Sequence, residues 1–246
     1  STKPMQSVSP QYEAEEKITV NGNVDLYAVV FNRTTETDLT EDQLPQVDIY
    51  KYKQVIFVGD SRTEFMENVL TGMGESATKN VKFVCSAGKG LDWFTTTGWA
   101  QLYSIVQHDS NSILSKKTAV IFNFGVNDLS KSADYAEYYN WIAPQLKSKG
   151  CELYFMSVNP VNRLMLPNAG RADRSEAAVR SFNQYMKANL SSAYTYIDMY
   201  SYLKSTGYSF ASDHYGTGTV DDGLHYTTRT YKRIFAKCMD SLRVPA

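Results

Sequence analysis

The sequence contains few of the residues that build metal sites and disulfide frameworks. It has only three cysteines and three histidines among 246 residues, and Cys85, Cys151 and Cys238 lie far apart in the chain. An odd number of scattered cysteines cannot form a disulfide framework, and no Cys-x-x-Cys or His-Glu-x-x-His pair is present to hold zinc. We therefore expect thiols that act as small apolar side chains.

A net charge of one sign and long hydrophobic runs are also missing. The 25 Lys and Arg residues nearly balance the 26 Asp and Glu residues, which leaves a formal charge of −1 and no electrostatic reason to bind nucleic acid or an anionic membrane. The most apolar stretches, such as residues 55–58 and 119–122, are far shorter than the run of about 18 apolar residues that a membrane span needs. Hydrophobic residues make up 43% and charged residues 21% of the chain, which excludes wholesale disorder.

The first 51 residues differ in pattern from the rest of the chain. Residues 17–20 and 23–30 predict two strands around an Asn21-Gly22 turn, because both turn residues tolerate positive φ. About 50 residues are too few for an independent β-sandwich, which needs about 100. We therefore expect an N-terminal extension over 1–51, with a β-hairpin packed on a main domain over 52–246. The start at Ser1 and the Tyr, Ser, Thr and Asn content suit a secreted or cell-surface protein whose leader has been removed, although a cytoplasmic enzyme also fits.

From residue 52 onward, short apolar runs alternate with helical patterns. The predicted strands cover residues 54–58, 81–85, 118–124, 152–158 and 194–197. The predicted helices cover residues 63–70, 99–113, 133–149, 174–190 and 227–242. Strands rich in Val, Ile and Phe, each followed by a helix, predict a three-layer α/β/α sandwich with a mostly parallel five-stranded sheet, as in flavodoxin-like folds. Ligands of such sheets bind beyond the carboxyl ends of the strands.

Three polar motifs lie at these strand ends or in the last loop. Ser61 follows the first strand, and a serine at a tight strand-to-helix turn exposes its hydroxyl. Asn127 follows the third strand, and its amide can donate to an oxyanion. Asp222 lies three residues before His225, a spacing at which the carboxylate can accept the imidazole Nδ1–H and leave Nε2 free as a base. Each motif taken alone also has an ordinary interpretation, as a helix cap, a turn or a surface histidine.

Taken together, the motifs resemble the SGNH (GDSL-like) hydrolase superfamily, whose functional residues lie in separate sequence blocks. The matching segments are Val58-Gly59-Asp60-Ser61 for the first block, Gly125-Val126-Asn127-Asp128 for the third and Asp222-Gly223-Leu224-His225 for the fifth. The second block falls in residues 85–90, where Gly90 is the first candidate and Gly88 the reserve. The sequence departs from the family at Cys85, where Asn is usual, and at Arg62, where an apolar residue is common.

The resemblance implies a role for each of these residues. Ser61 would be the nucleophile, His225 its general base, and Asp222 the acid that orients His225. The backbone N–H groups of Ser61 and Gly90 and the side chain of Asn127 would form the oxyanion hole. Asp60 is expected to support the turn without reacting. This chemistry needs no metal and no organic cofactor.

The resemblance also implies a carboxylic ester hydrolase. We expect a small-molecule or polysaccharide ester as substrate, with short acyl groups such as acetyl on a carbohydrate or cell-wall polymer. A lipase or lysophospholipase, a thioester hydrolase and an O-acyltransferase are alternatives on the same fold, and a non-catalytic carbohydrate-binding domain is another. Trp93, Phe94 and Trp99 can either border the cleft or pack in the core. Arg62 can either meet an anionic substrate group or form a structural ion pair.

Overall fold

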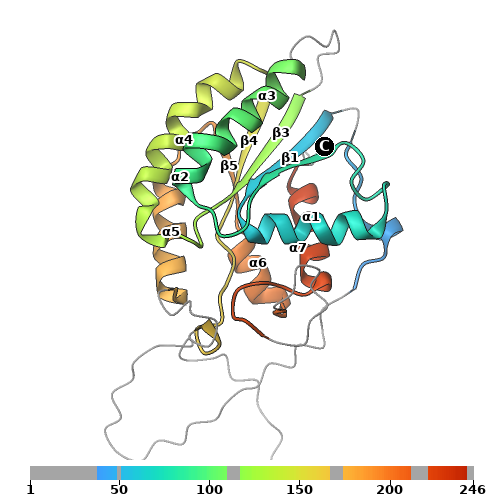
Figure 1. Cartoon of the computed structure of the whole chain (residues 1–246), viewed down its shortest axis with the longest axis vertical. Coiled ribbons are helices and arrows are strands. Elements are labelled where there is room, and N and C mark those ends of the chain that lie inside the picture. The colour runs from blue at the N-terminus through green and yellow to red at the C-terminus, as the bar shows by residue number, and fades with distance from the viewer. Residues whose placement is uncertain (1–37, 49–50, 110–116, 167–173, 212–220, 243–246) are drawn as a thin grey trace, which may run out of the picture.

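The computed structural model describes residues 38–48, 51–109, 117–166, 174–211 and 221–242. The hairpin predicted over residues 17–30 lies outside the described residues. The described part of the chain forms a parallel sheet with helices on both faces, which confirms the predicted α/β/α sandwich (Figure 1).

The sheet has five strands in the order β2-β1-β3-β4-β5, and each neighbouring pair runs parallel. The strands are β1 (Tyr52–Gly59), β2 (Val81–Cys85), β3 (Lys117–Asn123), β4 (Cys151–Met156) and β5 (Tyr194–Ile197). At the carboxyl edge, Gly59 of β1 is in register with Cys85 of β2 and with Asn123 of β3. The three segments that follow these residues therefore begin side by side.

Helices cover both faces of the sheet (Figure 1). The α-helices are α1 (Ser61–Met73), α2 (Leu91–Trp93), α3 (Trp99–Asp109), α4 (Ser132–Lys147), α5 (Glu176–Asn189), α6 (Met199–Thr206) and α7 (Thr228–Ser241). A π-helical turn (Phe94–Gly98) joins α2 to α3, and short 3₁₀ helices lie at Glu41–Gln43 and Leu129–Lys131. The α2, α3, α4 and α5 helices pack on one face, whereas α1, α6 and α7 pack on the other.

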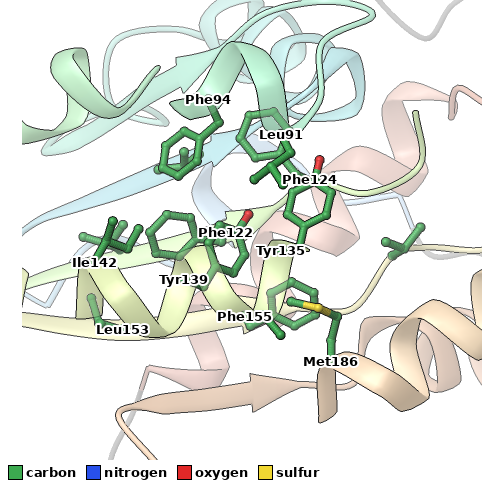
Figure 2. Close-up of a cluster of buried hydrophobic side chains, with 14 of the residues drawn as sticks. Leu91, Phe94, Phe122, Phe124, Tyr135, Tyr139, Ile142, Leu153, Phe155 and Met186 are labelled. Atoms are coloured by element: carbon green, nitrogen blue, oxygen red, sulfur yellow. The ribbon is translucent and has the colours of Figure 1, made fainter. Parts of the chain in front are cut away.

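The sheet residues divide between two hydrophobic cores. Along β1, Val55 and Phe57 enter the core beneath α1, α6 and α7, while Ile56 and Val58 enter the opposite core. This alternation follows from the period of two in a strand, and both faces are apolar because both are covered. Figure 2 shows the second core, in which Phe94 and other aromatic rings gather between the sheet and its helices. Phe94 is fully buried, so it packs in the core and does not border the cleft.

The structure corrects several sequence predictions about local elements. Helix α1 begins at Ser61 rather than at residue 63, and it continues through Gly72. The short α2 and α6 helices were not predicted, because segments this short show too few turns to establish a helical period. Cys151 and Cys238 are buried as expected, whereas Cys85 is half-buried and its thiol donates to Glu67.

In the part of the chain that the structure describes, no helix has both the length and the hydrophobicity required to cross a membrane.

Candidate active site

The turn after β1 presents Ser61 at the start of α1. Asp60 is the N-cap, and its side chain accepts the backbone N–H of Arg62 at 3.0 Å. The interpretation of Ser61 as the helix cap is therefore wrong, and Asp60 supports the turn as expected. Ser61 is the first residue of the helix, where the N–H has no intrahelical acceptor and stays available to another group. The helix therefore needs neither the hydroxyl nor the N–H of Ser61 for its own hydrogen bonds.

His225 lies between Ser61 and Asp222, as the sequence predicts. Its Nε2 is 2.9 Å from Ser61 Oγ, and its Nδ1 is 2.7 Å from Asp222 Oδ2. All three residues are nearly buried, with 5%, 4% and 8% of Ser61, His225 and Asp222 exposed. The structure therefore unites a hydroxyl, an imidazole and a carboxylate within proton-transfer distance, although 164 positions separate Ser61 from His225.

A tight turn brings Asp222 back onto His225. Asp222 Oδ1 accepts the backbone N–H groups of Leu224 and His225, at 2.9 and 2.8 Å. Gly223 adopts a φ of 73°, and a Cβ at this position would lie 2.5 Å from the Asn162 carbonyl oxygen. A residue with a side chain would therefore be strained in this turn.

The surroundings of Asp222 keep its carboxylate ionised. Burial alone would raise the pKa of this group, but the hydrogen bonds from the His225 side chain and from the backbone outweigh burial and hold the pKa well below its usual range. An ionised carboxylate can stabilise an imidazolium as it forms.

Phe65 also contacts His225, although no motif of the sequence indicated this residue. Its ring stacks on the imidazole with 4.3 Å between the ring centroids and 29° between the planes. Phe65 lies four residues after Ser61, so both side chains occupy the same face of α1. That spacing is the signal in the sequence from which the contact could have been inferred.

Arg62 serves the site in a way that the sequence did not suggest. The side chain is 3% exposed, and it donates to three backbone carbonyls. Its Nε reaches Leu224 O at 3.0 Å, while Nη1 and Nη2 reach Asn159 O and Pro160 O, each at 2.8 Å. The expectation that Arg62 meets an anionic substrate group or forms an ion pair is therefore wrong. Its guanidinium instead connects the start of α1 to the segment after β4 and to the residue before His225.

Asp60 is the second buried carboxyl beside the nucleophile. Burial raises its pKa to about 6, although the nearby Arg62 charge and the Arg62 N–H act in the opposite direction. Because the pKa in the folded state exceeds the value of an unperturbed aspartate, this group stabilises the fold most at acidic pH. That contribution is lost as the pH rises through about 6.

Asn127 and Gly90, the two further oxyanion candidates from the sequence, lie beside each other. Asn127 Nδ2 donates to the carbonyl oxygen of Lys89 at 2.8 Å. The amide nitrogen of Gly90 belongs to the same peptide group, roughly 2.2 Å from that oxygen. The two nitrogen atoms are therefore no more than about 5 Å apart, and the Gly90 N–H points to the side of its trans peptide opposite the Lys89 oxygen. Since Asn127 uses one of its two amide hydrogens on Lys89, the second stays available.

The structure distinguishes Gly90 from Gly88. A Cβ on Gly90 would overlap the carboxylate of Asp128, whereas a Cβ on Gly88 would meet no atom within 4 Å. Asp128 is held in place because it accepts the N–H of Leu91 at 2.9 Å and the hydroxyl of Tyr135 at 2.7 Å. Close packing against Asp128 therefore requires glycine at position 90, and Gly90 stays the first candidate from the sequence for the oxyanion residue.

Alanine substitutions test this assignment. We expect Gly90→Ala to lower kcat for an activated ester about 10²-fold, because the new methyl group pushes the Gly90 peptide away from Asp128 and misplaces its N–H. Gly88 has a φ of 68°, so Gly88→Ala costs about 1–2 kcal/mol in backbone strain but leaves kcat within about twofold. Steady-state kinetics and thermal unfolding of both variants provide the measurement. A larger kcat loss in Gly88→Ala than in Gly90→Ala would reverse the assignment.

The fold and these side chains together define a class of enzymes, the carboxylic ester hydrolases built on a parallel α/β/α sandwich. Comparison with known families agrees: the model of the GDSL-like lipase/acylhydrolase family matches residues 55–238. The chain belongs to this family.

Solved structures share the fold at low sequence identity. A protein from Slackia heliotrinireducens, assigned to the SGNH hydrolases, is 12% identical with a TM-score of 0.55, and the match covers 78% of this chain and 100% of that one. A protein from Bacteroides fragilis NCTC 9343, assigned as an acylhydrolase, is 16% identical with a TM-score of 0.50, and the match covers 82% of this chain and 92% of that one. No curated protein matches the sequence.

Proposed function

We propose that this protein hydrolyses short acyl esters through Ser61, His225 and Asp222. The observation that carries the proposal is the continuous hydrogen-bonded row of the three side chains, with 2.9 Å between Ser61 Oγ and His225 Nε2 and 2.7 Å between His225 Nδ1 and Asp222 Oδ2. This arrangement activates a serine hydroxyl at neutral pH without any other group.

The reaction follows from the positions of the atoms. Ser61 Oγ attacks the ester carbonyl carbon while His225 Nε2 takes the hydroxyl proton. The resulting oxyanion accepts hydrogen bonds from the N–H groups of Ser61 and Gly90 and from the Asn127 amide. His225 then returns the proton to the leaving alcohol. Water, activated by the same imidazole, releases the acid from the acyl-enzyme and restores the Ser61 hydroxyl.

The preference for short acyl groups on a carbohydrate rests on the border of the site. The segment after β2 runs past Asn127, and Ala87, Gly88 and Lys89 are exposed there. This segment is also tied to α1, because the Ala87 N–H donates to Glu64. A small and polar border suits a hydrated alcohol such as a sugar hydroxyl better than a long acyl chain, which needs extended apolar contact. Secretion or display at the cell surface stays a prediction from the sequence.

Esters of different chain length test the substrate proposal. We expect kcat/KM to be at least about tenfold higher for 4-nitrophenyl acetate than for 4-nitrophenyl octanoate, because Ala87, Gly88 and Lys89 beside Asn127 offer little apolar surface to the longer chain. Acetylated xylan should release acetate at the same site, and the Ser61→Ala variant provides the blank for every substrate. A clear preference for octanoate would favour a lipase or lysophospholipase. Faster turnover of the matching thioesters would favour a thioester hydrolase.

A further inference from the structure

We propose that Arg174 is a positioning residue that orients the Asn127 amide for its part in the oxyanion hole. This inference rests on the proposed function, since it assigns a cause to the orientation of one of the oxyanion donors. Arg174 lies directly before Ser175, the N-cap of α5. It is half-buried, and the sequence pattern indicated only that a helix starts there.

Two hydrogen bonds connect Arg174 to consecutive residues after β3. Its Nη2 donates to Asn127 Oδ1 at 2.9 Å, and its Nε donates to the Val126 carbonyl oxygen at 2.8 Å. The planar guanidinium thus donates hydrogen bonds to a side-chain oxygen and a backbone oxygen at the same time. Such a fork restricts both the χ angles of Asn127 and the backbone that carries it.

The chemistry of the two neighbours decides which way the amide faces. A guanidinium has donors only, so the atom of Asn127 that faces Arg174 must be its oxygen. The Lys89 carbonyl has acceptors only, so the atom that faces Lys89 must be the nitrogen. A flipped amide would place its NH₂ group against the N–H groups of Arg174 and its oxygen against the Lys89 carbonyl oxygen. Arg174 and Lys89 therefore select the single orientation in which the NH₂ group lies beside the Gly90 peptide.

The charge of Arg174 also strengthens the amide as a donor. A hydrogen bond from an ionised group polarises its acceptor, and the polarised amide donates more strongly through its N–H groups. The orientation and the polarisation of the amide both act on the developing oxyanion and neither acts on substrate binding, so we expect kcat to fall when Arg174 is removed while KM stays nearly constant.

A double-mutant cycle tests the proposal on the whole chain, with 4-nitrophenyl acetate as substrate. We expect Arg174→Met to lower kcat about tenfold, with KM within about twofold of the wild type. The loss of kcat is smaller than the loss of about 10²–10³-fold that typically follows removal of a whole oxyanion donor, because the amide itself is still present. In the Asn127→Ala background the same substitution should lower kcat less than about twofold, because the amide that Arg174 orients is gone. Arg174→Lys should be intermediate, since an ammonium donates from one centre and cannot hold both oxygen atoms as the fork does.

Arg180→Met is the matched control, because it removes the same charge from α5 at a side chain that contacts Tyr200. It should leave kcat unchanged, and thermal unfolding of every variant reports its stability. Two outcomes would overturn the role of Arg174: an equal loss of kcat with and without Asn127, or no loss in the wild-type background. The proposed function fails separately, if Ser61→Ala retains the wild-type rate.

Discussion

Replacing Ser61 with alanine is expected to lower kcat for 4-nitrophenyl acetate by at least about 10³-fold. The substitution removes the oxygen that lies 2.9 Å from His225 Nε2, while the helix start and its Asp60 cap stay in place. Any residual rate would come from the oxyanion donors acting on water, which is far slower than attack by an activated serine. The fold should be unaffected, because alanine fits wherever the small serine side chain fits.

Ser205→Ala is the matched control, since Ser205 is an exposed serine of α6 whose hydroxyl donates to a backbone carbonyl of its own helix. It should keep the wild-type rate. A fluorophosphonate should add one covalent group to the wild type and to Ser205→Ala, but none to Ser61→Ala. Hydrolysis or labelling that survives in Ser61→Ala would show that another residue is the nucleophile.

Asp222→Asn is expected to lower kcat about 10⁴-fold with little loss of stability. An asparagine oxygen can still accept the backbone N–H groups of Leu224 and His225, so the turn persists. Its NH₂ group, however, would then face His225 Nδ1 and favour the tautomer that carries the proton on Nε2. That tautomer cannot take a proton from Ser61, which explains the size of the loss in a triad of this kind.

The neighbouring Asp221 provides the control for this experiment. It accepts hydrogen bonds from the side chain of Asn162 at 2.9 Å and from the Gly223 N–H at 2.7 Å. Asp221→Asn removes the same charge one residue away and should stay within about tenfold of the wild-type kcat. Since the pKa of Asp222 is held below its usual range, its titration should not contribute to the pH–rate profile above about pH 4. Equal losses of kcat in the two variants would show that the effect comes from charge or loop structure. Asp222 would then not have the role proposed for it beside His225.

The position of the site could be predicted because of the parallel sheet. Gly59, Cys85 and Asn123 form one row across β1, β2 and β3, so the motifs that follow these residues converge. The strand patterns were visible in the sequence because both sheet faces are covered and the strands are almost wholly apolar. The pairing of Asp222 with His225 was visible because it is local.

The contacts that support the site could not be predicted in the same way. Arg62 finds its acceptors 97, 98 and 162 positions along the chain, and no local pattern indicates such partners. The need for glycine at position 90 depends on its close approach to Asp128, which follows a different strand. The orientation of Asn127 likewise depends on Arg174, 47 positions away. Each of these features arises from packing between segments and not from the residues of one segment.

The Arg62 contacts also set the order in which the enzyme becomes active during its synthesis. Ser61 leaves the ribosome early, but the imidazole that contacts it and one of the three carbonyls that accept hydrogen bonds from the Arg62 guanidinium belong to the segment at Leu224 and His225. Until that segment is translated and docks, Arg62 Nε lacks this acceptor and has to stay hydrated. We therefore expect Ser61 to be unreactive in a nascent chain. The time at which ester hydrolysis begins after release from a stalled ribosome can report when the segment at Leu224 and His225 docks.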